Sequence, residues 1–328
     1  MRRVLVTGGS GFIGTHLVVG LQSRGDQVSN IDLKPPILTE QTGCWTRLDL
    51  MDHEGLARHV AEFRPQIVYN LAAVADIALG GEALKVNTEG LRHLLEAAQA
   101  LPVPPRLIHA STQLVAGPGY QISGPRDYSP YTEYGESKAA SEEILWNWTG
   151  DIVWTIVRPT VVWGPWHPSF GGSTWKYLNR RWYMITGGKD PVRTYSYVDN
   201  LVAQLIAAAE VAPERVGAKM FYGGDAPIPT SWWLDGFAKA LTGKPARRVP
   251  YALLSGLAWA GEALGRIGGP SPINRGRLYR MTSEYVVPLE DTFEILGEGP
   301  VTLEEGIART VDWLRADQPE EFARRQRG

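Results

Sequence analysis

The hydrophobic pattern in the first half of the chain alternates between two periods. Short runs rich in valine, isoleucine and leucine occupy residues 4–7, 27–32, 67–73, 106–111 and 151–158. Between them lie longer stretches with apolar residues at helical spacing, such as 82–100, where one long helix is expected. Buried strands that alternate with amphipathic helices are typical of a parallel sheet covered on both faces. The pattern therefore predicts an α/β fold with a doubly wound parallel sheet.

Beyond Pro159 the periodicity weakens and turns become frequent. Further helices are expected at 201–210, 231–241 and 303–314, and a strand at 219–222. We predict a first domain at 1–160, with returning segments at about 190–222. A smaller mixed α/β lobe, formed by 161–189 and 223–328, is expected to bind substrate.

A glycine-rich turn connects the first apolar run to the first helical stretch. Gly8, Gly11 and Gly14 follow the spacing G-x-x-G-x-x-G. In such a turn the glycines allow a tight bend, close approach of a pyrophosphate and close helix–strand packing, and the helix N-terminus attracts an anion. We expect these glycines, together with Phe12 and Ile13, to contact a dinucleotide, which makes the predicted sheet one of Rossmann type.

Asp32 ends the second apolar run. A dinucleotide fold places at this point an acid that accepts hydrogen bonds from the adenosine ribose. A carboxylate repels a 2′-phosphate, so Asp32 favours NAD over NADP, although the nearby Lys34 keeps NADP open as the less favoured cofactor. The structural alternative is that Asp32 is a turn residue at the end of a strand.

Candidate catalytic side chains follow the apolar run at 106–111. Ser111 and Thr112 lie at its carboxyl end, where open α/β sheets bind ligands. Tyr134 and Lys138 stand four residues apart in a helix expected to begin near Tyr131, so both project from one helical face. Taken alone, such a pair is common on amphipathic helices with a solvated lysine.

Composition and charge exclude several classes of function. The net charge is −2, which provides no field for nucleic acid or an anionic membrane, and neither is expected as a partner. The single cysteine, Cys44, cannot form an intrachain disulfide, which favours a cytoplasmic location. No signal peptide and no membrane span are expected, and no metal site is predicted. The apolar stretch 251–265 is interpreted as a helix packed on the protein surface, with membrane contact the less favoured alternative.

Taken together, the motifs of this chain resemble the extended short-chain dehydrogenase/reductase superfamily, in its NAD-dependent epimerase/dehydratase branch. The resemblance covers residues 3–314. The motifs lie, in the order the family has them, at 7–14, 32, 49–50, 70–73, 87–90, 111–112, 134–138, 158–159 and 193–199.

The resemblance implies three catalytic roles. Tyr134 would be the general acid/base that takes a proton from a substrate hydroxyl while a hydride passes to the nicotinamide. Free tyrosine has a pKa near 10, and the Lys138 ammonium would lower it by favouring the phenolate. Lys138 would also hold the nicotinamide ribose, and Thr112 would bond the same substrate oxygen as Tyr134.

The resemblance also implies a set of cofactor contacts. Asp49 and Leu50 would contact adenine, and the three residues Leu71, Ala72 and Ala73 would line the central groove of the cofactor. The family motifs that contain Asn87 and Pro159 place these two residues at the cofactor as well. Relatives often form homodimers through the two helices that begin near Glu82 and Tyr131, so a homodimer is expected here.

The residues after Thr112 distinguish the reactions of the family. Sugar dehydratases and decarboxylases of this kind carry a glutamate there, and some epimerases carry a cysteine for carbon deprotonation. This chain has Gln113 and Leu114, neither of which exchanges a proton, and Cys44 lies elsewhere. Dehydration is therefore disfavoured, and chemistry that needs only hydride transfer and one hydroxyl proton remains.

Two enzymatic functions fit this chemistry. The favoured one is 4-epimerisation of a nucleotide-activated sugar through transient oxidation, because Arg193 matches the arginine that grips the diphosphate. The alternative is a dehydrogenase or reductase of another alcohol, similar to 3β-hydroxysteroid dehydrogenases, because Val161 stands where epimerases often carry asparagine. A non-catalytic NAD-binding protein is a remote third reading.

Other residues of the second half are weaker candidates for the substrate site. His167 is a candidate substrate contact, although a loop-surface position is the simpler interpretation. Trp163, Trp166 and Trp175 are candidates either for stacking on a base or sugar or for core packing.

Overall fold

The computed structural model describes residues 1–74, 81–168, 175–180, 184–188, 190–266, 274–317 and 319. The chain forms two compact units. Unit 1 comprises Met1–Val162, Val198–Asp225 and Pro288–Pro300, and unit 2 comprises Trp163–Tyr197, Ala226–Val287 and Val301–Gly328. The chain therefore leaves unit 1 and returns to it twice.

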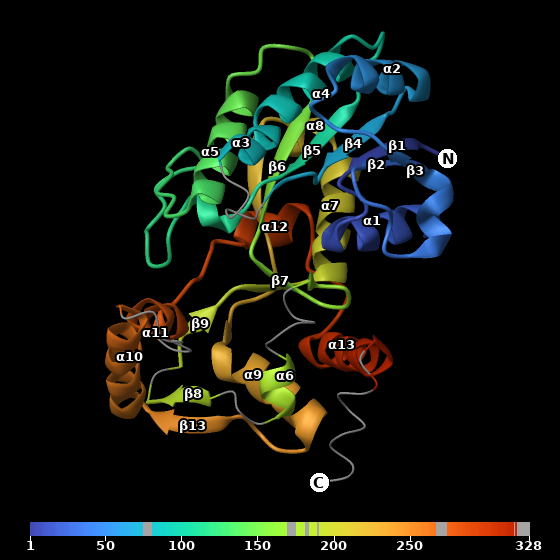
Figure 1. Ribbon diagram of the computed structural model, residues 1–328. Helices are drawn as coiled ribbons and strands as arrows, with labels where there is room; N and C mark the ends of the chain where they lie inside the picture. Colours follow the sequence, from blue (N-terminus) through green and yellow to red (C-terminus); the bar gives the residue numbers. More distant parts are fainter. Residues whose placement is uncertain are drawn as a thin grey trace. The chain divides into compact units, whose positions relative to one another are not determined.

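Unit 1 is built on a seven-stranded sheet with the order β11-β6-β5-β4-β1-β2-β3, and every pairing in it is parallel (Figure 1). The strands are β1 (Arg3–Thr7), β2 (Gln27–Asp32), β3 (Trp45–Arg47), β4 (Ile67–Asn70), β5 (Arg106–Ala110), β6 (Trp154–Pro159) and β11 (Lys219–Gly223). The strand order reverses between β1 and β4, which is the switch point where doubly wound sheets bind ligands. The predicted Rossmann-type fold is confirmed.

Helices cover both faces of this sheet, as Figure 1 shows. They are α1 (Phe12–Ser23), α2 (His53–Phe63), α4 (Glu89–Gln99), α5 (Glu133–Trp146), α7 (Val198–Glu210), α8 (Pro213–Val216) and α12 (Glu290–Ile295). Because side chains alternate along a strand, Val4 and Val6 of β1 pack in the cluster that includes Leu17 of α1 and Leu205 of α7. Leu5 packs in the opposite cluster, with residues of α2, α4 and α5.

The prediction of a single helix over 82–100 is wrong. The segment forms α3 (Gly81–Leu84), a 3₁₀ turn (Lys85–Asn87) and then α4. Asn87 ends the 3₁₀ turn, and its side chain bonds the backbone of Val74: the amide group donates to the Val74 carbonyl (3.0 Å) and its oxygen accepts from the Val74 N–H (2.9 Å). An asparagine whose side chain bonds distant backbone in this way favours a break over a continuous helix.

Helix caps in unit 1 follow the local sequence. Asp52 caps α2 by accepting a hydrogen bond from the Gly55 N–H at 3.0 Å. Thr132 caps α5 in the same way through the Gly135 N–H, also at 3.0 Å, so this helix begins at Glu133, two residues later than expected. The Thr132 cap fixes the start of α5, the helix that carries Tyr134.

Unit 2 contains two strand pairs and several helices. β8 (Met184–Gly187) pairs with β13 (Arg247–Pro250) in parallel, and β9 (Val192–Arg193) pairs with β12 (Ile228–Pro229) in antiparallel fashion. The helices are α6 (Trp175–Asn179), α9 (Thr230–Thr242), α10 (Tyr251–Arg266), α11 (Arg275–Thr282) and α13 (Leu303–Asp317). No helix among the described residues is both long and apolar enough to cross a membrane.

An aromatic cluster forms the core of unit 2. The Trp163 ring lies 4.8 Å from Tyr197, 6.0 Å from Trp233 and 5.4 Å from Phe237, measured between ring centroids. Trp163 is only 1% exposed, so it is a core residue and does not present its indole to solvent. Of the two other stacking candidates, Trp166 is half-buried, and the side chain of Trp175 lies outside the described residues.

Candidate functional site

The glycine turn after β1 is packed too tightly for any side chain. Gly8 has a φ of +72°, and a Cβ there would lie 2.6 Å from the backbone nitrogen of Ala72. A Cβ on Gly14 would lie 2.6 Å from the Cα of Gly9. The first contact joins the turn to the segment after β4, and the second holds α1 against the turn, which is the role expected for the third glycine.

The turn and Asp32 form a cradle that fits a dinucleotide. Gly11 is the N-cap of α1 and has no side chain to cap it, so the helix start can be approached closely. The Asp32 carboxylate is turned toward the same loop, since it accepts hydrogen bonds from the Ser10 N–H (3.1 Å) and the Lys34 N–H (2.9 Å). The start of α1 and the Asp32 carboxylate therefore lie together, an arrangement that suits the pyrophosphate and the ribose of a dinucleotide.

The segments predicted to line the rest of the cofactor groove are tied to this cradle. Thr7 accepts hydrogen bonds from the N–H groups of Leu71 (3.1 Å, at its carbonyl) and Ala72 (3.2 Å, at its hydroxyl). Leu50 is buried, and its carbonyl is bonded to Nδ1 of His93 at 2.9 Å. Asp49 accepts from the Met51 N–H at 2.9 Å. These contacts order the loops after β3 and β4.

Thr112 and Tyr134 are brought toward each other by a close approach of backbone. Thr112 follows β5 and caps a short 3₁₀ turn by accepting from the Leu114 N–H at 3.2 Å. Gly135 packs against that turn so closely that a Cβ on it would collide with the Leu114 carbonyl. The sequence reasoning missed Gly135, although a glycine in the first turn of a helix, next to a candidate catalytic tyrosine, was a usable signal.

The expected lowering of the Tyr134 pKa is wrong for the chain by itself. Burial raises the pKa of the Tyr134 phenol to about 12, because a phenolate loses hydration in this environment. Burial also lowers the pKa of Lys138 to about 8. At pH 7 the phenol is therefore neutral, and the Lys138 ammonium loses its proton more readily than a solvated lysine does.

Lys138 lies in a buried polar network that the sequence did not reveal. Its Nζ lies 3.5 Å from Nε2 of His109, and His109 bridges Asn70 (3.0 Å) and Ser141 (3.0 Å). Asn70 accepts in turn from the Thr7 hydroxyl at 2.6 Å. Burial and the adjacent ammonium hold the pKa of His109 well below its usual range, so the imidazole is neutral. The network connects the end of β1 to the candidate catalytic lysine.

A second buried hydrogen-bond network begins at Ser111, the residue before Thr112. Ser111 donates to Glu142, which is bonded by Arg158 through Nε (2.8 Å) and Nη2 (2.6 Å). The side chains of Glu142 and Arg158 are both fully buried. The pair ties α5 to β6, next to the two candidate catalytic segments.

Asn87 and Pro159 also lie in unit 1. Besides bonding Val74, Asn87 donates to the Ser137 hydroxyl at 2.8 Å, so it links the segment after β4 to α5. Pro159 is buried at the end of β6. Both lie at carboxyl ends or connections of the central strands, the region where open sheets bind ligands.

The predicted substrate contacts fall in both units. Val161 belongs to unit 1, whereas His167 and Arg193 belong to unit 2. Arg193 donates from Nε and Nη2 to the Ser283 carbonyl, at 3.2 and 3.0 Å. Burial lowers the pKa of His167 to about 4, so it is neutral at pH 7. The described residues contain no group of His, Cys, Asp or Glu arranged to hold a metal ion.

A comparison with protein families decides the classification. The family model described as "NAD dependent epimerase/dehydratase family" matches residues 4–220 of this chain. The chain belongs to this family. The predicted membership of the extended short-chain dehydrogenase/reductase superfamily and the prediction of NAD as cofactor are thereby confirmed.

Individual relatives carry different activities. A 3-beta-hydroxysteroid dehydrogenase from Mycolicibacterium neoaurum is 29% identical over 77% of this chain and 73% of its own length. A probable UDP-glucuronate 4-epimerase from Rhizobium meliloti is 26% identical over 95% of this chain and 96% of its own length. The UDP-glucose 4-epimerase of Thermus thermophilus, solved in complex with NAD, is 25% identical, with a TM-score of 0.70 over 95% of this chain and 99% of that one.

Proposed function

We propose that this enzyme of the NAD-dependent epimerase/dehydratase family is a 4-epimerase of a nucleotide-activated sugar. The observation that carries the proposal is the pair Gln113 and Leu114 beside Thr112, which supplies no proton-exchanging group for elimination. The relation to a UDP-glucuronate 4-epimerase over nearly the full length of both chains supports it.

In this proposal three side chains act at the sugar hydroxyl. Thr112 and Tyr134 hydrogen-bond the hydroxyl oxygen, and Tyr134, in its phenolate form, receives the hydroxyl proton as the C–H bond at the same carbon breaks. NAD, held at the glycine turn and Asp32, would supply the hydride acceptor, and would return the hydride after the sugar has turned over in the site. Tyr134 then gives its proton back to the carbonyl oxygen, so protons and electrons balance over the cycle.

Lys138 and the glycine cradle prepare the site for this step. Lys138 stands one helical turn after Tyr134, and its ammonium is proposed to favour the ionised phenol during the reaction, against the burial that raises the Tyr134 pKa to about 12. We assign NAD binding to Gly8, Gly11, Gly14 and Asp32, on the cradle that they form. Arg193 is proposed to bind the diphosphate of the substrate.

The second candidate is a dehydrogenase of another secondary alcohol. Two observations favour it: Arg193 already donates two hydrogen bonds to the Ser283 carbonyl, and a 3-beta-hydroxysteroid dehydrogenase is among the relatives. Catalysis at the hydroxyl would be the same, but the hydride would remain on the cofactor.

One assay separates the two candidates. Purified protein with NAD is incubated with UDP-glucose, UDP-glucuronate and a panel of secondary alcohols that includes 3β-hydroxysteroids. An epimer formed without a lasting rise in absorbance at 340 nm supports the epimerase. A steady rise at 340 nm supports the dehydrogenase and contradicts our proposal.

Replacement of the proposed acid/base tests the chemistry directly. We expect Tyr134→Phe to lower kcat by about 10²- to 10⁴-fold, the usual contribution of a positioned acid/base, with NAD binding retained. Tyr120→Phe, in an exposed loop of unit 1, is the matched control and should leave kcat unchanged. Unchanged turnover in Tyr134→Phe would remove Tyr134 from the mechanism.

A further inference from the structure

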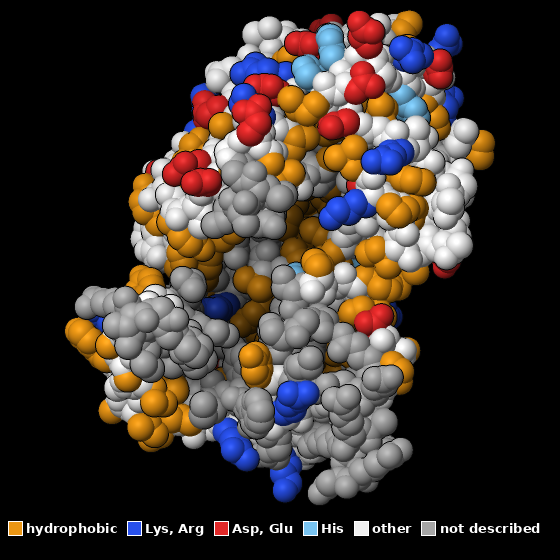
Figure 2. All heavy atoms as spheres, in the orientation of Figure 1, with side chains coloured by type: hydrophobic (Ala, Val, Ile, Leu, Met, Phe, Trp, Pro, Cys, Tyr) orange, Lys and Arg blue, Asp and Glu red, His pale blue; other side chains and the backbone are white. Residues whose placement is uncertain are grey.

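Helix α10 has an apolar outer face. Leu254 and Ala258 point inward and pack with Leu278 of α11. On other sides of the helix, Leu253 is 57% exposed, Leu257 46% and Trp259 59%. Leu253 and Leu257 are four residues apart, so they project side by side. In Figure 2, hydrophobic side chains gather on the surface where Figure 1 places this helix.

Cationic residues are frequent in the sequence on either side of α10. Residues 244–283 contain Lys244, Arg247, Arg248, Arg266, Arg275, Arg277 and Arg280, against the single acid Glu262. The whole chain, in contrast, has a net charge of −2. Arg247, Arg248 and Arg275 are exposed, and they lie in β13 and α11, two of the elements that pack with α10. Some of this charge is offset, since Arg248 pairs with Asp235 at 2.9 Å and Arg275 with Glu262 at 4.0 Å.

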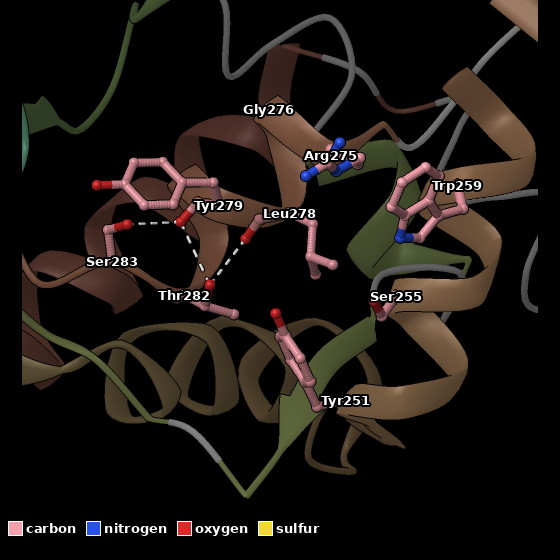
Figure 3. A pocket seen from close by; sticks show the side chains of 9 residues that line it. All are labelled: Tyr251, Ser255, Trp259, Arg275, Gly276, Leu278, Tyr279, Thr282 and Ser283. Carbon is pink, nitrogen blue, oxygen red and sulfur yellow. Dashed lines mark hydrogen bonds between the residues drawn. The ribbon is translucent and has the colours of Figure 1, made fainter. Parts of the chain in front are cut away.

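A groove of about 600 Å³ opens between α10 and α11 (Figure 3). Arg275 lies at one end, with its guanidinium carbon 4.4 Å from the centre of the Trp259 ring. Other lining residues include Tyr251, Ser255, Leu278 and Tyr279, and also Thr282 and Ser283, whose hydroxyls donate to backbone carbonyls of α11. A guanidinium suits a phosphate group, and the adjoining aromatic and aliphatic side chains suit its acyl neighbours.

We propose that α10, with β13 and α11 beside it, docks on the surface of an anionic phospholipid bilayer. Leu253 and Leu257 enter the boundary of the acyl region, Trp259 and Tyr279 lie at the headgroup level, and the groove at Arg275 receives a lipid phosphate. Interfacial helices bind in this manner through apolar area together with cations around it. The proposal is independent of the reaction catalysed in unit 1.

Charge favours a bilayer over a second copy of this chain. A symmetric dimer through this face would bring two copies of the same patch together, so the cations of each copy would lie near those of the other. Like charges brought together in an interface are unfavourable, whereas anionic headgroups neutralise them. The exposed aromatic residues at the edge of the apolar face also match the membrane–water boundary, where tryptophan and tyrosine are enriched.

Vesicle co-sedimentation tests the proposal. Full-length protein is mixed with vesicles of phosphatidylcholine alone, or with 30% phosphatidylglycerol, at low and at 0.5 M salt. We expect binding to the anionic vesicles only, weakened by salt. The double variant Leu253→Glu/Leu257→Glu should lose at least tenfold in affinity, because two apolar contacts are replaced by charges that the lipid repels.

A matched control carries the same charge change elsewhere. Val19→Glu/Val103→Glu alters two exposed valines of unit 1, which are 43% and 79% exposed, and should bind vesicles as the parent protein does. Circular dichroism and NAD binding verify that both variants are folded. Arg275→Glu should lower affinity without affecting NAD binding.

Three results would overturn the proposal. They are no binding to anionic vesicles, binding that Leu253→Glu/Leu257→Glu retains, and equal binding to neutral vesicles. Sedimentation velocity provides a further check. A dimer that dissociates in Leu253→Glu/Leu257→Glu but not in the control would assign this face to a second copy of the chain.

Discussion

Two neighbouring carboxylates of α5 have opposite environments. Glu142 is fully buried and paired with the buried Arg158, whereas Glu143 pairs with Arg126 at the surface. Removal of one member of a buried pair leaves an uncompensated charge in a medium that solvates it poorly. An exposed pair contributes little, because water and salt screen it. The two positions allow burial to be tested on one helix.

We expect Glu142→Gln to lower the free energy of unfolding by about 3–5 kcal/mol. Glu143→Gln, its neighbour and control, should change the same quantity by less than about 1 kcal/mol. Urea denaturation of both variants measures the difference. Equal effects would show that Arg158 finds another counter-charge, and would contradict the role given to the buried pair.

Lys138 shows how the same burial prepares a reactive group. Removal of water lowers the pKa of its ammonium to about 8, while Glu142, one turn further along α5, acts in the opposite direction. At neutral pH, Lys138 is therefore closer to its pKa than a solvated lysine would be. A solvated lysine in this helix would titrate near its ordinary value of about 10.4.

At the scale of the element, the glycine turn is the feature that tolerates least change. We expect Gly14→Ala to abolish NAD binding or to unfold unit 1, because the added Cβ would meet the backbone of Gly9 at 2.6 Å. The measurements are thermal melting with and without NAD, and a fluorescence titration with the cofactor.

A second glycine gives the opposite expectation. A Cβ on Gly256, within α10, would meet nothing within 4 Å. Gly256→Ala should therefore stabilise the protein by about 0.5–1 kcal/mol, since alanine is the better helix former. If both substitutions were equally harmful, the close packing at Gly14 would not be the cause.

Sequence reasoning succeeded where a signal is local. The apolar runs predicted the parallel strands, and the glycine spacing marked the turn. It failed where the deciding contact is distant. Asn87 breaks the helix expected over 82–100 by bonding Val74, and His109 reaches Lys138 from a strand 29 residues away. Such contacts produce no periodic pattern of residue types in the sequence, because they depend on how distant segments pack together.

At the scale of the whole molecule, buried neutral histidines link stability to pH. Burial lowers the pKa of His59 and His109, and lowers that of His167 to about 4. In the unfolded chain each titrates near 6.5. Below pH 6.5 the unfolded chain therefore binds protons that the native state does not, and stability falls as the pH decreases.

We expect the free energy of unfolding to be lower at pH 5 than at pH 7, by about 2 kcal/mol for His109 alone. Urea titrations at both values measure it, and His109→Asn should show a smaller difference. Asp26 does not interfere, because Arg2 lowers the pKa of its carboxyl from 3.8 and its contribution is lost only at more acidic pH. An equal pH dependence in His109→Asn would exclude the imidazole as the source.

The division of unit 1 among three chain segments has a consequence for synthesis. β11 pairs with β6, and the carbonyl of Tyr222 in β11 accepts a hydrogen bond from Thr292 of α12 at 2.7 Å. The sheet of unit 1 therefore lacks β11 until residue 223 has left the ribosome, and it lacks α12 until residue 295 has done so. During translation β6 presents an unpaired edge for as long as β11 has not emerged, which is the condition under which nascent chains need a chaperone.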